Sequence, residues 1–172
     1  MCYFVVRNGK KVVSSACMIG FLGEYEVTLD AKGRFLLPAG FKKQLGDDDV
    51  SFVINRGFEK CLSLYPQKSW QPIFEKVSRL NDFDPKVRQF RRQFLGGASA
   101  IETDSAGRIL VPPTLREFAG LTKNIILASA VDKIEIWDAE TYKNMYDNFS
   151  PELFSDLASE VMSGDTNEKE GA

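Results

Sequence analysis

The chain has 172 residues, of which 44% are hydrophobic and 27% charged, a composition that suits one compact domain or two small ones. It contains no histidine, which excludes Ser-His and Cys-His nucleophile pairs, and its three widely spaced cysteines do not form a zinc or redox motif. The net charge of −2 argues against a protein that binds nucleic acid by bulk charge alone.

Residues 1–17 form an N-terminal extension ahead of the strongly patterned part of the chain. The uncharged run over 12–23 is too short for a membrane helix, which needs about 20 residues. We therefore expect a cytoplasmic protein with no membrane segment.

The first patterned segment, residues 18–80, predicts a series of short strands and helices. Apolar and polar residues alternate over 24–29, which indicates a strand that leads into a glycine turn. The expected elements after that turn are a strand over 35–37 ended by Pro38, a helix over 39–45 stopped by Gly46, strands over 51–55 and 61–65, and a longer helix from Pro66.

A linker over 81–97 contains a helix that Asp84 caps. Residues 98–150 then predict the same series again: a strand over 109–111, a helix over 113–119 stopped by Gly120, strands over 124–129 and 133–137, and a helix from near Asp138. Residues 151–172 are expected to hold the end of the C-terminal helix and an acidic tail that is disordered from Ser163.

These two series form an internal repeat. The segment 30–38, DAKGRFLLP, matches the segment 104–112, DSAGRILVP, at an offset of 74 residues. The match continues downstream, where Lys42 aligns with Arg116. The chain is therefore two copies of one module.

Each copy carries an Asp-x-x-Gly-Arg turn. Gly33 and Gly107 can adopt positive φ, which other residues adopt only at a steric cost. Asp30 and Asp104 are predicted to hold the turns by accepting backbone N–H groups. An exposed carboxylate repels phosphate, so these two aspartates are assigned a structural role.

The arginines that follow the glycines are the candidate DNA-binding residues. Arg34 and Arg108 each project from a rigid loop, and a guanidinium offers a planar fork of donors for phosphate oxygens or for guanine O6 and N7. Lys32 adds a cation to the first turn, whereas the second turn has Ala106 at that position. A purely structural ion pair between each Asp and its Arg is an equally good interpretation of the residues alone.

The enzyme interpretation is rejected. Two aspartates from two similar halves suggest the dyad of aspartic proteases, but that motif places glycine two residues after Asp, where this chain has Lys32 and Ala106. No catalytic residue, metal site or cofactor is assigned.

Charge is distributed unevenly along the chain. Residues 1–75 carry a net charge of +2, residues 76–116 carry +4 and residues 117–172 carry −8. This distribution permits one basic face, although drift of this kind is common. Arg88, Arg91 and Arg92 could extend such a face, or could simply be the solvated side of the linker helix.

The two turns and their surroundings closely resemble the MraZ family of bacterial transcriptional regulators. The matching segments are FLGEY at 21–25, LDAKGR at 29–34 and the block at 104–112. The resemblance implies an α+β fold, in which two AbrB-like swapped-hairpin β-barrel repeats interlock in one chain with flanking helices. It also implies ring-shaped homo-oligomers.

The same resemblance implies a function. It predicts a sequence-specific, nucleoid-associated DNA-binding regulator that acts on direct repeats upstream of the division and cell-wall gene cluster, with Arg34, Arg108 and Lys32 at the DNA. Family members begin near the FLGEY segment, so translation is expected to start at Met18. The alternative is an oligomeric scaffold or partner-binding protein that makes no direct DNA contact.

Overall fold

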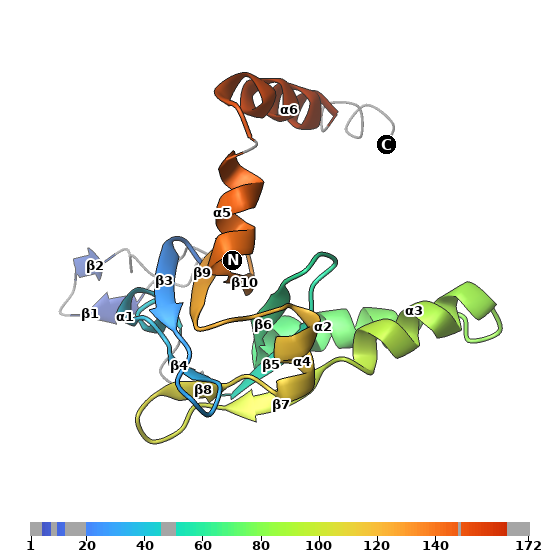
Figure 1. The fold of residues 1–172 in the computed structure, drawn as a ribbon, viewed down its shortest axis with the longest axis horizontal. Coiled ribbons are helices and arrows are strands. Elements are labelled where there is room, and N and C mark those ends of the chain that lie inside the picture. Colours follow the sequence, from blue (N-terminus) through green and yellow to red (C-terminus); the bar gives the residue numbers. More distant parts are fainter. Residues whose placement is uncertain (1–4, 8–9, 13–19, 46–50, 148, 165–172) are drawn as a thin grey trace. The chain divides into compact units, whose positions relative to one another are not determined.

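The computed structural model describes residues 5–7, 10–12, 20–45, 51–147 and 149–164, which fall into two compact units, 1–139 and 140–172 (Figure 1). Met18, Gly46 and the end of the acidic tail lie outside the described residues. Within the extension, β1 (Val5–Arg7) and β2 (Lys10–Val12) pair as an antiparallel hairpin. Across the described ranges, no helix combines the length and the apolar character needed to cross a membrane.

The rest of the first unit contains eight strands and four helices among its described residues. In chain order they are β3 (Glu24–Thr28), β4 (Arg34–Leu36), α1 (Ala39–Lys42), β5 (Ser51–Arg56), β6 (Leu62–Pro66), α2 (Gln67–Ser78), α3 (Pro85–Leu95), β7 (Ser99–Glu102), β8 (Arg108–Leu110), α4 (Pro113–Phe118), β9 (Asn124–Ala130) and β10 (Lys133–Asp138). The predicted elements are thus confirmed, with ends that differ by one to three residues. α1 is shorter than the predicted 39–45 because the Gln44 amide bonds to the Phe41 carbonyl in a tighter turn.

The C-terminal region differs from the sequence-based expectation. The helix predicted near Asp138 is α5 (Ala139–Asp147), and a separate helix, α6, spans Pro151–Gly164. Ser163 therefore belongs to a helix, and the prediction that the disordered tail begins there is wrong. The apolar side chains of α6 recur at helical spacing through Val161, which favours helix over a solvated coil.

Strands of the two halves are interleaved in one six-stranded antiparallel sheet, whose order is β3-β9-β10-β6-β5-β7. β3 comes from the first half and pairs with β9 of the second, with Tyr25 opposite Leu127. β10 of the second half pairs with β6 of the first, and β5 of the first half pairs with β7 of the second. Each half therefore completes the sheet of the other.

The two halves also share one hydrophobic core. Fully buried side chains of the first half, such as Phe35 and Leu64, pack in one cluster with Ile109, Leu127 and Ile134 of the second half. Because this cluster draws on both halves, neither half can bury its apolar face without the other.

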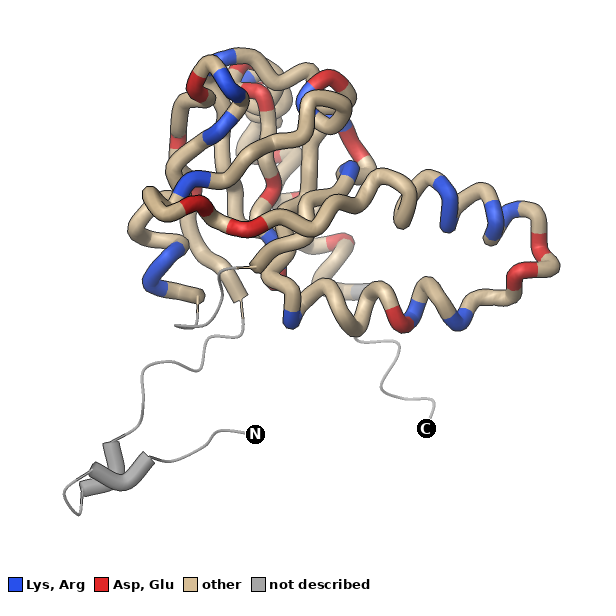
Figure 2. Tube along the Cα trace, turned by 90° about the horizontal axis from the view of Figure 1, so that it is seen from below, with Lys and Arg blue, Asp and Glu red and all other residues tan. Residues whose placement is uncertain are grey.

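A helical hairpin of α2 and α3 extends from the sheet (Figures 1 and 2). Asp84 caps α3 as predicted, because its carboxylate accepts a hydrogen bond of 2.8 Å from the Lys86 amide. The two helices are joined near the base of the hairpin by stacking of Phe94 of α3 on Trp70 of α2, with ring centroids 5.6 Å apart, and Phe90 of α3 stacks on Phe94 at 5.4 Å.

Candidate nucleic-acid interface

The two Asp-x-x-Gly-Arg turns are joined by a short antiparallel ribbon of β4 and β8, which lies beside β7 (Figure 1). Phe35 lies opposite Ile109 at its centre, and both side chains are fully buried. The ribbon continues beyond its strands, because the Leu37 amide donates to the Gly107 carbonyl and the Val111 amide to the Gly33 carbonyl. Each turn is therefore built by one half of the chain and bonded to the other.

The first turn is closed by its aspartate. Asp30 Oδ1 accepts hydrogen bonds from the Lys32 and Arg34 amides at 2.9 and 3.0 Å. Asp30 Oδ2 accepts one from Arg34 Nε at 2.8 Å and lies 2.7 Å from Arg34 Nη2. Gly33 adopts a positive φ of +77°, which allows the chain to reverse its direction in the turn.

The second turn has the same geometry. Asp104 Oδ1 accepts hydrogen bonds from the Ala106 and Arg108 amides, both at 2.9 Å, and Asp104 Oδ2 accepts one from Arg108 Nε at 2.8 Å. The φ of Gly107 is +73°. The Arg108 side chain is 38% exposed, against 25% for Arg34, whose Nη1 lies 3.9 Å from Asp104 Oδ2. The intra-turn ion pairs are present, and they fix each arginine in place without burying it.

These contacts stabilise the charged form of both aspartates. The hydrogen bond from the Arg34 side chain, followed by that from the Arg34 amide, lowers the pKa of Asp30 from 3.8 to about 2. The pKa of Asp104 is also lowered, mainly by the hydrogen bond from the Arg108 amide. Both carboxylates are therefore ionised at neutral pH, and each offsets part of the charge of its arginine.

We expect the Asp30 carboxyl to titrate near pH 2 in the folded protein. Because its folded pKa lies below the ordinary value of 3.8, the stabilisation it provides is complete above that value and is lost as the pH falls from 3.8 towards 2. NMR titration of the carboxyl carbon measures the midpoint, and Arg34→Ala should shift it upwards. An unchanged midpoint in that variant would contradict the assigned cause.

Two further cations lie against the glycine turns, and each comes from the opposite half of the chain. A Cβ atom built on Gly107 would lie 2.6 Å from Nζ of Lys42, the last residue of α1. A Cβ built on Gly33 would lie 3.2 Å from Nη1 of Arg116, on α4. Sequence reasoning assigned no role to Lys42 or Arg116. The available signal was their alignment in the repeat, where both positions are basic.

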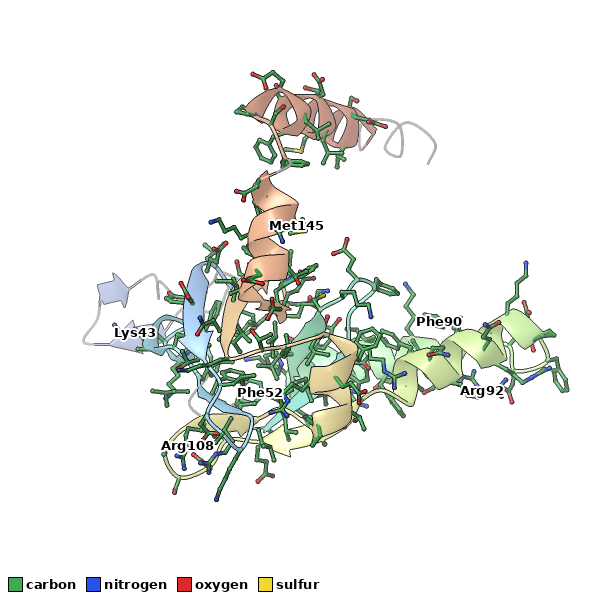
Figure 3. The ribbon with its side chains drawn as sticks, in the orientation of Figure 1. Lys43, Phe52, Phe90, Arg92, Arg108 and Met145 are labelled. Atoms are coloured by element: carbon green, nitrogen blue, oxygen red, sulfur yellow. The ribbon has the colours of Figure 1, made fainter. Side chains whose placement is uncertain are left out.

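The remaining candidates lie elsewhere. Figure 3 shows Arg92 on the helical hairpin, well separated from Arg108 on the ribbon. Arg91 of that hairpin donates to the Asp82 carboxylate and to the Leu80 carbonyl, and Arg88 donates to two carbonyls of the same connection. These contacts hold the tip of the hairpin together. In the part of the chain that the structure describes, no cluster of three or more His, Cys, Asp or Glu residues is arranged to hold a metal ion.

Comparison with known proteins finds one family and several relatives whose sequences match most of this chain. A family model described as "MraZ protein, putative antitoxin-like" matches the chain twice, over residues 20–93 and 94–163. A protein of Flavobacterium psychrophilum named transcriptional regulator MraZ is 44% identical over 151 residues, which cover 87% of this chain and 95% of that protein. A protein of Christiangramia forsetii with the same name is 42% identical over 150 residues, covering 86% and 96%.

Among solved structures, the solution structure of PHS018 from Pyrococcus horikoshii matches with a TM-score of 0.30 and 16% identity, covering 67% of this chain and 87% of that one. The family model spans most of the chain in two copies, and the named relatives align over nearly their whole length. The chain therefore belongs to the MraZ family.

Proposed function

We propose that this protein is a sequence-specific DNA-binding transcriptional regulator that acts on direct repeats upstream of the division and cell-wall gene cluster. The observation that carries the proposal is the ribbon of β4 and β8, on which Arg34 and Arg108 are fixed by their own aspartates. A two-stranded ribbon has the dimensions to enter the major groove of DNA. The names of the two relatives support the same function.

Arg34, Arg108 and Lys32 contact the DNA in this proposal, and Asp30, Gly33, Asp104 and Gly107 shape the turns that present them. Lys42 and Arg116 add positive charge beside the same turns. Phosphate contacts of these cations set the register, and a smaller number of contacts to base edges read the sequence.

The interleaved strands support a pair of AbrB-like swapped-hairpin barrel repeats, with the first repeat over 18–80, the linker over 81–97 and the second repeat over 98–150. We further propose that the protomers form a ring in the cytoplasm, associated with the nucleoid. One protomer presents only the few cations of its two turns, so its phosphate contacts are weak alone. A ring presents several ribbons to adjacent DNA repeats, which raises the affinity without new kinds of contact.

The function is tested by titrating salt into a binding assay with the DNA that lies upstream of the protein's own gene. The internal repeat provides matched variants for this assay. Lys32→Ala gives the first turn the residue that the second turn has at Ala106, where the same hydrogen bonds form, so the turn should persist. If Lys32 contacts one phosphate, its loss should make the plot of log affinity against log salt less steep, by roughly 0.9 per bound protomer. Ala106→Lys should make the plot steeper by a similar amount.

The scaffold alternative predicts a different outcome. If the turns serve only assembly, neither exchange alters the slope, and no upstream fragment competes better than unrelated DNA of equal length. Gel-shift titrations from about 50 to 200 mM salt, with oligomeric state measured in parallel, separate the two functions.

A further inference from the structure

The ribbon carries an exposed apolar pair beside its arginines. Successive side chains of a strand point to opposite faces, so Phe35 and Ile109 enter the core while Leu36 and Leu110 face outwards. Leu36 is 55% exposed and Leu110 is 47% exposed. About half of each leucine side chain is therefore left open to solvent, while the core-facing residues of the ribbon, Phe35 and Ile109, are completely buried.

The register of the ribbon pairs each leucine with an arginine of the other half. Leu36 lies opposite Arg108, and Leu110 lies opposite Arg34. Residues directly opposite on one face of an antiparallel pair have Cβ atoms about 5 Å apart. The outward face of the ribbon is therefore a compact patch of two leucines and two arginines, arranged with approximate two-fold symmetry.

The surroundings of this patch favour a polyanion over an apolar protein surface. Arg34 and Arg108 lie within it, and Lys42 and Leu36 both approach Gly107: a Cβ on Gly107 would be 2.6 Å from Lys42 Nζ and 3.9 Å from Leu36 Cδ1. Burial of Lys42 against another protein would be costly without a matching carboxylate on that protein. DNA offers phosphates for the cations and, in its major groove, one exposed apolar group, the C5-methyl of thymine.

We propose that Leu36 and Leu110 are specificity-determining residues that contact thymine methyl groups in the major groove. The inference rests on the proposed DNA-binding function and deepens it. The arginines supply attraction and polar contacts, and the leucines distinguish thymine from the other bases by apolar contact. Burial of one methyl-sized group contributes about 0.8 kcal/mol, or roughly fourfold in affinity for each contacted thymine.

The test compares two forms of the DNA upstream of the protein's own gene, one amplified with thymidine triphosphate and one with deoxyuridine triphosphate in its place. The two duplexes differ only in the thymine methyl groups. Full-length wild-type protein should bind the thymine duplex at least fourfold more tightly. Leu36→Ala/Leu110→Ala should bind both duplexes equally, at about the affinity of wild type for the uracil duplex. Any difference in shape between the two duplexes affects the binding of every variant in the same way. The part of the preference that is lost in the double alanine variant therefore reports the methyl contact alone.

Two controls accompany the test. Leu22→Ala removes a leucine of similar exposure, 56%, that lies outside the ribbon, and it should keep the wild-type preference for thymine. Leu36→Met/Leu110→Met keeps the apolar volume and should retain most of the preference.

Each other outcome has a defined meaning. Equal binding of both duplexes by wild type, or an undiminished preference in the double alanine variant, overturns this inference and leaves the proposed function intact. A changed oligomeric state with an undiminished preference would show that the leucines contact another copy of the chain instead. Failure of wild type to bind either duplex overturns the proposed function and this inference together.

Discussion

Replacement of both turn arginines, Arg34→Ala/Arg108→Ala, should abolish specific binding to the upstream region. Each guanidinium is fixed by its aspartate and remains partly exposed, so little conformational entropy is lost when it meets DNA. Loss of one bidentate contact to a base costs about 1–3 kcal/mol, which is roughly 5- to 150-fold in affinity for each arginine. Gel-shift titration measures the effect, and light scattering checks that the oligomeric state is retained.

An arginine substitution also removes the intra-turn ion pair, so Asp30→Asn and Asp104→Asn are the matched controls. The asparagine oxygen can still accept the backbone amides that close each turn, while the ion pair is lost. If the arginines contact DNA, these variants lose much less affinity than the arginine variants, because removal of a carboxylate near the phosphates offsets the weaker fixing of each arginine. Equal losses in the aspartate and arginine variants would mean that the arginines act only by shaping the turns.

Phe35→Ala should destabilise the fold by about 3–5 kcal/mol, the usual cost of removing a fully buried aromatic ring from a core. Phe35 lies opposite Ile109 in the ribbon and belongs to the core shared by both halves. Its loss therefore weakens the contact between the halves as well as the packing beneath the turns. Chemical denaturation measures the change, at one fixed protomer concentration because the proposed assembly would contribute to the apparent stability.

The adjacent residue provides the control for this prediction. Leu36 points to the opposite face and is 55% exposed, so Leu36→Ala should change stability by no more than about 0.5 kcal/mol. A loss from Leu36→Ala as large as that from Phe35→Ala would contradict the assigned orientation of the ribbon. The same measurement establishes that the leucine variants are folded before their DNA binding is compared.

Much of the local structure follows from short-range patterns in the sequence. The turns at Gly33 and Gly107, the cap at Asp84 and the helix stop at Gly120 each depend on residues within a few positions, and the structure has each of them. The end of the C-terminal helix was less predictable, because the polar residues near Ser163 are compatible with both helix and coil.

The repeat, the turns and the candidate arginines Arg34 and Arg108 were determined by the sequence itself, because each is encoded by a motif of nine residues. Only the tertiary structure decided that the two motifs form one ribbon, with Lys42 and Arg116 each placed against the turn of the opposite half. The physical reason is that strand pairing over 74 residues depends on the burial of a core shared by both halves, and no local pattern specifies which distant strand completes a sheet. The same register turns Phe35 and Ile109 inwards, and it leaves the two leucines beside the arginines on the outer face.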